Sequence, residues 1–224
     1  MKLKGFIFDL DGTLLNTLED VAAAENKTLT EFGLPTRPAE EFRFLVGGGA
    51  EDIARRLLPP EMHSPENIMN FIYKFRANYH LNWHDKTRLY PGLTDLINHL
   101  LDENFPLAVL SNKPEEFTQK LVDFFFGNWL GYEDRKVFSP VIGQRKDQPV
   151  KPDPTLALDI ASQWKLPAES IGLIGDSDID VFTAKNAGMF AIGAGWGFRG
   201  KAELAAAGAR IILDRPFDLL RYLD

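Results

Sequence analysis

Short hydrophobic runs recur along the chain, and longer stretches with a helical period separate them. The runs end at turn residues, as is typical of buried strands, and they lie at residues 6–10, 107–110, 171–174, 190–192 and 210–213. The helical stretches have recognisable ends, with Pro114 and Pro154 near starts and Gly188 and Gly208 near stops. Strands that alternate with helices predict an α/β fold in which helices flank a parallel sheet. Ligands are then expected at the carboxyl ends of the strands.

Residues 18–88 interrupt this alternation, because they contain helical patterns and no convincing strand. One helical face carries Leu18, Val21, Ala22, Leu29 and Phe32, and a second stripe carries Ile68, Phe71, Ile72, Phe75 and Tyr79. We interpret both stripes as packing core. The pattern predicts a small α-helical domain at 18–88, inserted into a core domain that comprises 1–17 and 89–224.

Composition and charge exclude several classes of protein. The chain has 224 residues, of which 45% are hydrophobic, so it can bury a substantial core. No hydrophobic segment is long enough for a membrane span, and a net charge of −7 argues against a nucleic-acid partner. The absence of cysteine excludes disulfides and thiolate chemistry. We therefore expect a cytoplasmic protein that binds neither membranes nor nucleic acid. We expect a monomer or homodimer, although composition does not choose between the two.

The first hydrophobic run leads directly into two carboxylates, Asp9 and Asp11, which Gly12 follows. Alternate residues of an extended segment share a face, so the two acids are expected to point the same way, and glycine permits a tight turn after them. Close carboxylates need a cation, and a hard divalent ion such as Mg²⁺ prefers oxygen ligands. The alternative is that the two acids merely cap the turn.

Polar residues also follow the other hydrophobic runs. Ser111 and Asn112 offer a hydroxyl and backbone N–H groups where a phosphate oxygen could bind, although Ser111 taken alone is more typical of a helix N-cap. Lys151 precedes Pro152 in a stiff loop and could bridge negative charges, whereas most lysines are solvated. Asp176 ends a later run and is expected to face the metal.

Asp180 follows Asp176 by four residues and could share its face where a helix begins. It could equally be an acid that only stabilises the start of that helix.

The order of these elements resembles the haloacid dehalogenase superfamily. The four motifs that carry the resemblance are Asp9-Leu10-Asp11-Gly12-Thr13, Ser111 after a strand, Lys151 before a proline, and Gly175-Asp176 with Asp180. The insertion after the first motif looks like the C1 cap of that family, which has a Rossmann-like parallel sheet core. The tail around residues 195–208 is similar to that of phosphoglycolate phosphatases.

The resemblance implies a Mg²⁺-dependent phosphatase. In such an enzyme Asp9 would attack phosphorus and form an aspartyl phosphate, and Asp11 would act as acid and then as base. Ser111 and Lys151 would hold phosphoryl oxygens. The expected metal ligands are Asp9, the backbone carbonyl of Asp11, Asp176 and Asp180.

The substrate is expected to be a small phosphorylated metabolite, with 2-phosphoglycolate favoured by the resemblance. Backbone N–H groups of the glycine-rich segment 45–50 could receive an anionic end of the substrate, or the segment could be a flexible joint. We assign substrate contacts to Thr13, Asn112, Gly47, Gly48 and Arg55.

Other functions remain open at this point. A sugar phosphomutase of the β-phosphoglucomutase kind would use the same acids and keep the phosphoryl group. A signalling receiver module also combines acids, a hydroxyl and a lysine, but it is shorter and lacks a cap. A protein that binds phosphate without turnover is a further alternative.

Overall fold

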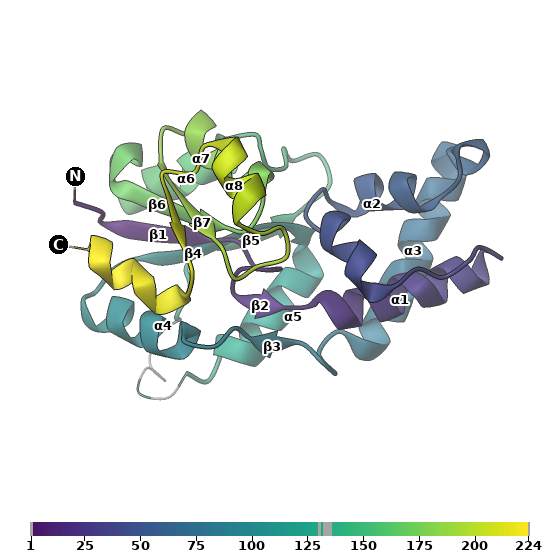
Figure 1. The fold of residues 1–224 in the computed structure, drawn as a ribbon, viewed down its shortest axis with the longest axis horizontal. Helices are drawn as coiled ribbons and strands as arrows, with labels where there is room; N and C mark the ends of the chain where they lie inside the picture. Colours follow the sequence, from purple (N-terminus) through teal and green to yellow (C-terminus); the bar gives the residue numbers. More distant parts are fainter. Residues whose placement is uncertain (1, 130, 132–135, 224) are drawn as a thin grey trace.

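Six parallel strands form the main sheet of the described part of the protein (Figure 1). The computed structural model describes residues 2–129, 131 and 136–223. In spatial order the strands are β5 (Val141–Gln144), β4 (Leu107–Pro114), β1 (Gly5–Phe8), β6 (Ile171–Gly175), β7 (Phe190–Ala194) and β8 (Ile211–Leu213). The α/β fold predicted from the alternation is therefore confirmed. The sequence pattern missed β5, and the first strand ends at Phe8 instead of residue 10.

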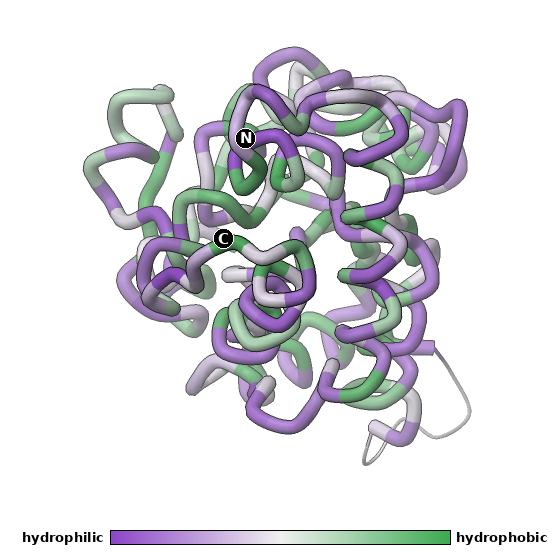
Figure 2. The backbone as a smooth tube through the Cα atoms, turned by 90° about the vertical axis from the view of Figure 1, so that its right-hand side faces the viewer, coloured by the Kyte–Doolittle hydropathy of each residue, from purple (hydrophilic) through white to green (hydrophobic). Residues whose placement is uncertain are grey.

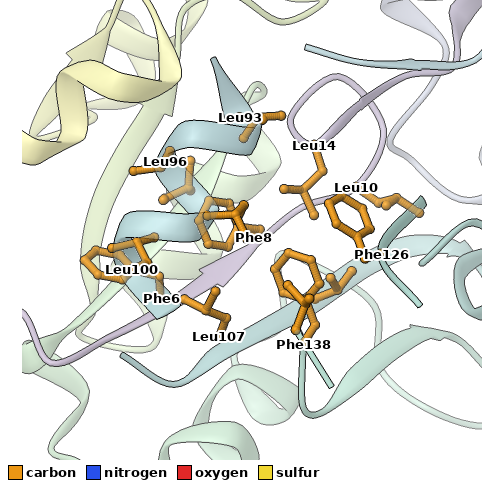
Figure 3. Packing of buried hydrophobic residues seen from close by; sticks show 14 of the residues in the cluster. Phe6, Phe8, Leu10, Leu14, Leu93, Leu96, Leu100, Leu107, Phe126 and Phe138 are labelled. Atoms are coloured by element: carbon orange, nitrogen blue, oxygen red, sulfur yellow. The ribbon is translucent and has the colours of Figure 1, made fainter. Parts of the chain in front are cut away.

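Helices cover both faces of this sheet. One face carries α4 (Leu93–Asp102), α5 (Glu115–Phe126) and the 3₁₀ segment η4 (Pro216–Tyr222), and the other carries α6 (Thr155–Trp164), η3 (Ala168–Ser170), α7 (Asp178–Asn186) and α8 (Lys201–Ala207). Alternate residues of β1 therefore enter different layers, because Phe6 and Phe8 pack with α4 while Ile7 packs with α6 and α7. Figure 3 shows Phe6 and Phe8 against the leucines of α4.

A group of helices lies beside the sheet, on the right in Figure 1. It consists of α1 (Leu18–Glu31), η1 (Ala39–Phe44), α2 (Ala50–Leu57), η2 (Pro60–Met62) and α3 (Pro65–Asn82). Residues 18–87, all of which are described, contain no strand. We call this group the cap. A short antiparallel pair, β2 (Leu15–Asn16) with β3 (Arg88–Leu89), joins it to the sheet, close to the domain boundary that the sequence predicts.

The cap has a hydrophobic core of its own, in which Leu18 and Leu29 of α1 pack with Ile68 and Phe71 of α3. Figure 2 shows hydrophobic and hydrophilic residues alternating along the helical turns, so that the helices have an apolar and a polar side. Among the described residues, no helix has both the length and the apolar character needed to cross a lipid bilayer.

Candidate active site

The sheet brings the first and last of the predicted acidic motifs together. Phe8 at the end of β1 is paired with Val109 of β4 and with Ile174 of β6. Asp9 follows Phe8 directly, and Ser111 and Asp176 come two residues after its two partners. Because parallel strands present their carboxyl ends at one edge, three segments distant in sequence meet there.

The sequence left open whether Ser111 caps a helix, and the structure excludes this. Strand β4 continues through Ser111 to Pro114, and α5 begins at Glu115. Ser111 is therefore not the N-cap of a helix. Its side chain is nearly buried and lines the cleft between the core and the cap.

Three carboxylates form an acid cluster, which we define as Asp9, Asp176 and Asp180. Each is buried, and each offers one oxygen within 4.8 Å of the oxygens of the others. The ammonium of Lys151 lies 2.8 Å from Oδ1 of Asp9 and 2.6 Å from Oδ1 of Asp180. One positive charge thus faces three acids, which leaves the cluster with an excess of negative charge when all three are ionised.

The protonation of the acid cluster reflects this excess. Burial raises the pKa of Asp9 to about 6; the charges of Asp180 and Asp11 add to the effect, while Lys151 opposes it. Burial, together with Asp180 and Asp9, also raises the pKa of Asp176 well above its usual range. Although burial disfavours the charged form of Lys151, the carboxylates of Asp180 and Asp9 raise its pKa, so it remains an ammonium.

The acid cluster can bind a hard divalent cation such as Mg²⁺, because it offers three buried carboxylates whose negative charge Lys151 neutralises only in part. Hydrogen bonds from neighbouring residues fix the positions of two of its carboxylates. The backbone N–H of Phe198 donates to Oδ2 of Asp176 at 2.6 Å, and Oγ of Ser177 donates to Oδ2 of Asp180 at 2.7 Å. Gly197 has to be glycine here, since a Cβ at this position would overlap the side chain of Asp176.

Asp11 is held apart from the acid cluster by its own partners. Oγ1 of Thr17 donates to Oδ1 of Asp11 at 2.6 Å, and Nζ of Lys113 lies 3.1 and 3.2 Å from its two oxygens. Its side chain lines the same cleft as Asp9, as the alternation of the first motif predicts. Asp11 is therefore placed to exchange a proton with a ligand bound between the two acids.

Asn112 links the backbone of Lys151 to the cap. Its carboxamide oxygen accepts a hydrogen bond from the backbone N–H of Lys151 at 2.8 Å, and its nitrogen donates to the carbonyls of Lys151 and Gly47, both at 3.0 Å. Asn112 also lines the cleft. Since both ends of the carboxamide are engaged, its evident role is to hold the backbone of Lys151 beside the acid cluster.

The other residues to which the sequence assigned substrate contacts lie in different settings. Gly47 lines the cleft, whereas Gly48 is not part of its lining among the described residues. Arg55 lies on the exposed surface of α2, where its Nη2 donates to Glu51 at 2.8 Å. Thr13 is fully buried, and it too is absent from the described lining. The geometry favours a substrate contact only for Gly47 in this group.

A cleft lies between the core and the cap, and residues of both line it. The core contributes Asp9, Asp11, Ser111 and Lys151, and the cap contributes Gly47 together with an apolar wall. The family model described as haloacid dehalogenase-like hydrolase matches residues 6–194.

The chain belongs to the haloacid dehalogenase-like hydrolases.

Two phosphoglycolate phosphatases align with this haloacid dehalogenase-like hydrolase over nearly their whole length. A phosphoglycolate phosphatase of Aquifex aeolicus is 31% identical over 99% of the chain and 97% of the relative. One from Vibrio cholerae is 30% identical over 95% and 93%. A crystal structure of a predicted phosphoglycolate phosphatase from Haemophilus somnus shares the fold with a TM-score of 0.88 and 26% identity, covering 100% of this chain and 99% of that one.

The sequence pattern of this haloacid dehalogenase-like hydrolase did not reveal every residue of the cleft. Val21, Phe75 and Tyr79 were interpreted as plain core, and they do pack with Phe117, but all four also line the cleft. Lys113 was given no place in the cleft, because a lysine after a strand is ordinarily solvated. Its position two residues after Ser111, directly before Pro114, was the one signal that pointed to it.

Glu25 of α1 is a second buried group that the sequence did not single out. It is 2% exposed, and burial raises its pKa to about 8, which the charge of Lys113 only partly offsets. The folded protein therefore binds the proton of Glu25 more tightly than the unfolded chain, whose pKa is 4.5. Stability is expected to fall as the pH rises from 4.5 to about 8 and then to level off.

Replacing Glu25 by Gln is expected to remove this part of the pH dependence. The stability of the variant relative to the parent should rise between pH 5 and pH 8, by on the order of a few kcal/mol. Urea unfolding at both pH values measures it, with the exposed Glu61→Gln as control. Equal pH dependence in parent and variant would show that Glu25 ionises freely in the folded state.

Proposed function

We propose that this chain is a Mg²⁺-dependent phosphatase that hydrolyses a small phosphomonoester through an aspartyl phosphate on Asp9, with 2-phosphoglycolate as the favoured substrate. The observation that carries the proposal is the pairing of Asp9 with Lys151 beside Asp11 in one cleft. A nucleophile, a cation and an acid–base group thus face the same space.

The chemistry needs two displacements at phosphorus. In the first, a carboxylate oxygen of Asp9 bonds to phosphorus, the ester bond breaks, and Asp11 gives its proton to the leaving oxygen. In the second, Asp11 takes a proton from water, which attacks phosphorus and releases phosphate, so that Asp9 returns to its starting form. Lys151 and Ser111 stabilise phosphoryl oxygens during both displacements.

Mg²⁺ would be held by the carboxylates of the acid cluster with the backbone carbonyl of Asp11, and when bound it supplies positive charge against the phosphoryl oxygens. The buried and incompletely compensated acids support this assignment.

The preference for 2-phosphoglycolate rests on the relatives, which carry that activity in their names and align over nearly the whole chain. A contact of Gly47 with the substrate belongs to the same proposal. A cytoplasmic location and a monomeric or dimeric state stay predictions.

The test is phosphate release from a panel of phosphorylated metabolites with Mg²⁺ and with chelator. We expect release that depends on Mg²⁺ and is fastest for 2-phosphoglycolate. No release from any ester would contradict the proposal. Isomerisation of a sugar phosphate with little free phosphate would identify a mutase instead.

A further inference from the structure

Two cationic side chains, those of Lys113 and Lys151, line the cleft among the described residues. Lys151 is engaged by Asp9 and Asp180 at the end where phosphorus would bind. Lys113 lies at a different place, beside Asp11. The proposed phosphatase chemistry has a use for Lys151 and leaves Lys113 without one.

Lys113 is an unusual lysine because it is buried and charged at the junction of the core and the cap. Its side chain is 5% exposed, and its ammonium lies 4.6 Å from the centre of the Tyr79 ring. Burial disfavours the charged form, but the carboxylate of Asp11 and the hydroxyl of Tyr79 raise its pKa above the ordinary value. Val21 and Phe75 complete an apolar wall there, so solvent screens this charge only weakly.

Resting on the proposed function, we propose that Lys113 determines specificity by binding a carboxylate of the substrate. The leaving oxygen has to lie within about 2.6–3.2 Å of Asp11, which protonates it. Nζ of Lys113 lies 3.1 Å from the same carboxylate. A carboxylate two bonds beyond the leaving oxygen therefore falls beside the ammonium. The site selects phosphate esters of 2-hydroxy acids over neutral esters of the same shape.

Two arginines of the cap are engaged by other groups. Arg43 donates to the carbonyl of Phe198 at 2.9 Å, and Arg56 lies 3.0 Å from Asp52. The N-terminus of α2 carries Glu51 and Asp52, whose negative charges oppose an anionic ligand at that end.

The charge of Lys113 also acts on a second buried acid, Glu25. It stays protonated at neutral pH, because burial raises its pKa to about 8. It therefore does not compete with a substrate carboxylate for the ammonium.

The experiment compares 2-phosphoglycolate with its carboxamide, 2-phosphoglycolamide, which keeps the shape and lacks the charge. We expect the parent to favour the acid by about tenfold to hundredfold in kcat/KM, as for a buried hydrogen bond to a charged group. Lys113→Met should bring this ratio close to one. Lys146→Met removes an exposed lysine, so it should keep the parental ratio.

The outcomes separate the alternatives. If Lys113 acts only by positioning Asp11, both esters slow by the same factor and the ratio stays parental, which overturns the specificity role and leaves the phosphatase proposal intact. If the parent hydrolyses the acid and the amide equally well, the specificity role of Lys113 is also overturned, and this test does not need a folded Lys113→Met variant. If the parent releases phosphate from neither ester nor from any other, the proposed function fails as well.

Discussion

Replacing Asp9 by Asn is expected to lower phosphate release by at least about 10⁴-fold, because the amide cannot form the covalent intermediate. The folded state should tolerate the change. Burial raises the pKa of Asp9 to about 6, so its negative charge is unfavourable in the folded protein despite Lys151. The free energy of unfolding at pH 7 is therefore expected to be no lower than that of the parent. Phosphate release and urea unfolding measure the two effects.

The matched control is Asp159→Asn, which makes the same change on an exposed position of α6. It should retain parental activity. If Asp9→Asn kept activity within tenfold of the parent, Asp9 would not be the nucleophile. A variant that is inactive because it has unfolded would be recognised by its urea curve.

Replacing Asp176 by Asn is expected to remove both the Mg²⁺ response and most of the activity, with a loss of at least about 100-fold. Because Asp176 is buried beside Asp180 and Asp9, its charge is unfavourable without a cation. We therefore expect the metal-free variant to unfold at no lower temperature than the metal-free parent. Mg²⁺ at 100 times its Kd should stabilise the parent by about 2.7 kcal/mol and the variant by much less.

Thermal unfolding with and without Mg²⁺ measures how much the ion stabilises the parent and Asp176→Asn, independently of catalysis. Asp178→Asn is the control, since Asp178 begins α7 two residues after Asp176 and lies outside the acid cluster. It should keep the parental response to Mg²⁺. An undiminished response in Asp176→Asn would mean that the ion binds at another place.

The local sequence pattern predicts those elements whose formation depends on neighbouring residues in the chain. The buried strands β1, β4 and β6 are runs of apolar residues with polar ends, and glycines stop the helices α7 and α8. Asp9 and Asp176 could be placed in one site because parallel strands end at one edge.

Edge strand β5 escaped prediction because its four residues are half-buried and contain glycine and glutamine. Their extended form depends on pairing with β4, which no local pattern encodes. The same holds for Ser111, whose place after a hydrophobic run fits the start of a helix in sequence. Only the pairing of β4 with its neighbours selects the strand.

The sequence by itself determined the α/β alternation, the acids at the strand ends and the membership of a hydrolase family, since periodicity and motif order are local properties of the chain. Only the tertiary structure decided how the cap meets the core. Lys113 contacts Asp11 across 102 positions of the chain and Tyr79 across the cleft. A lysine becomes a buried cation only when distant groups desolvate and pair it, and no neighbouring residue reports that.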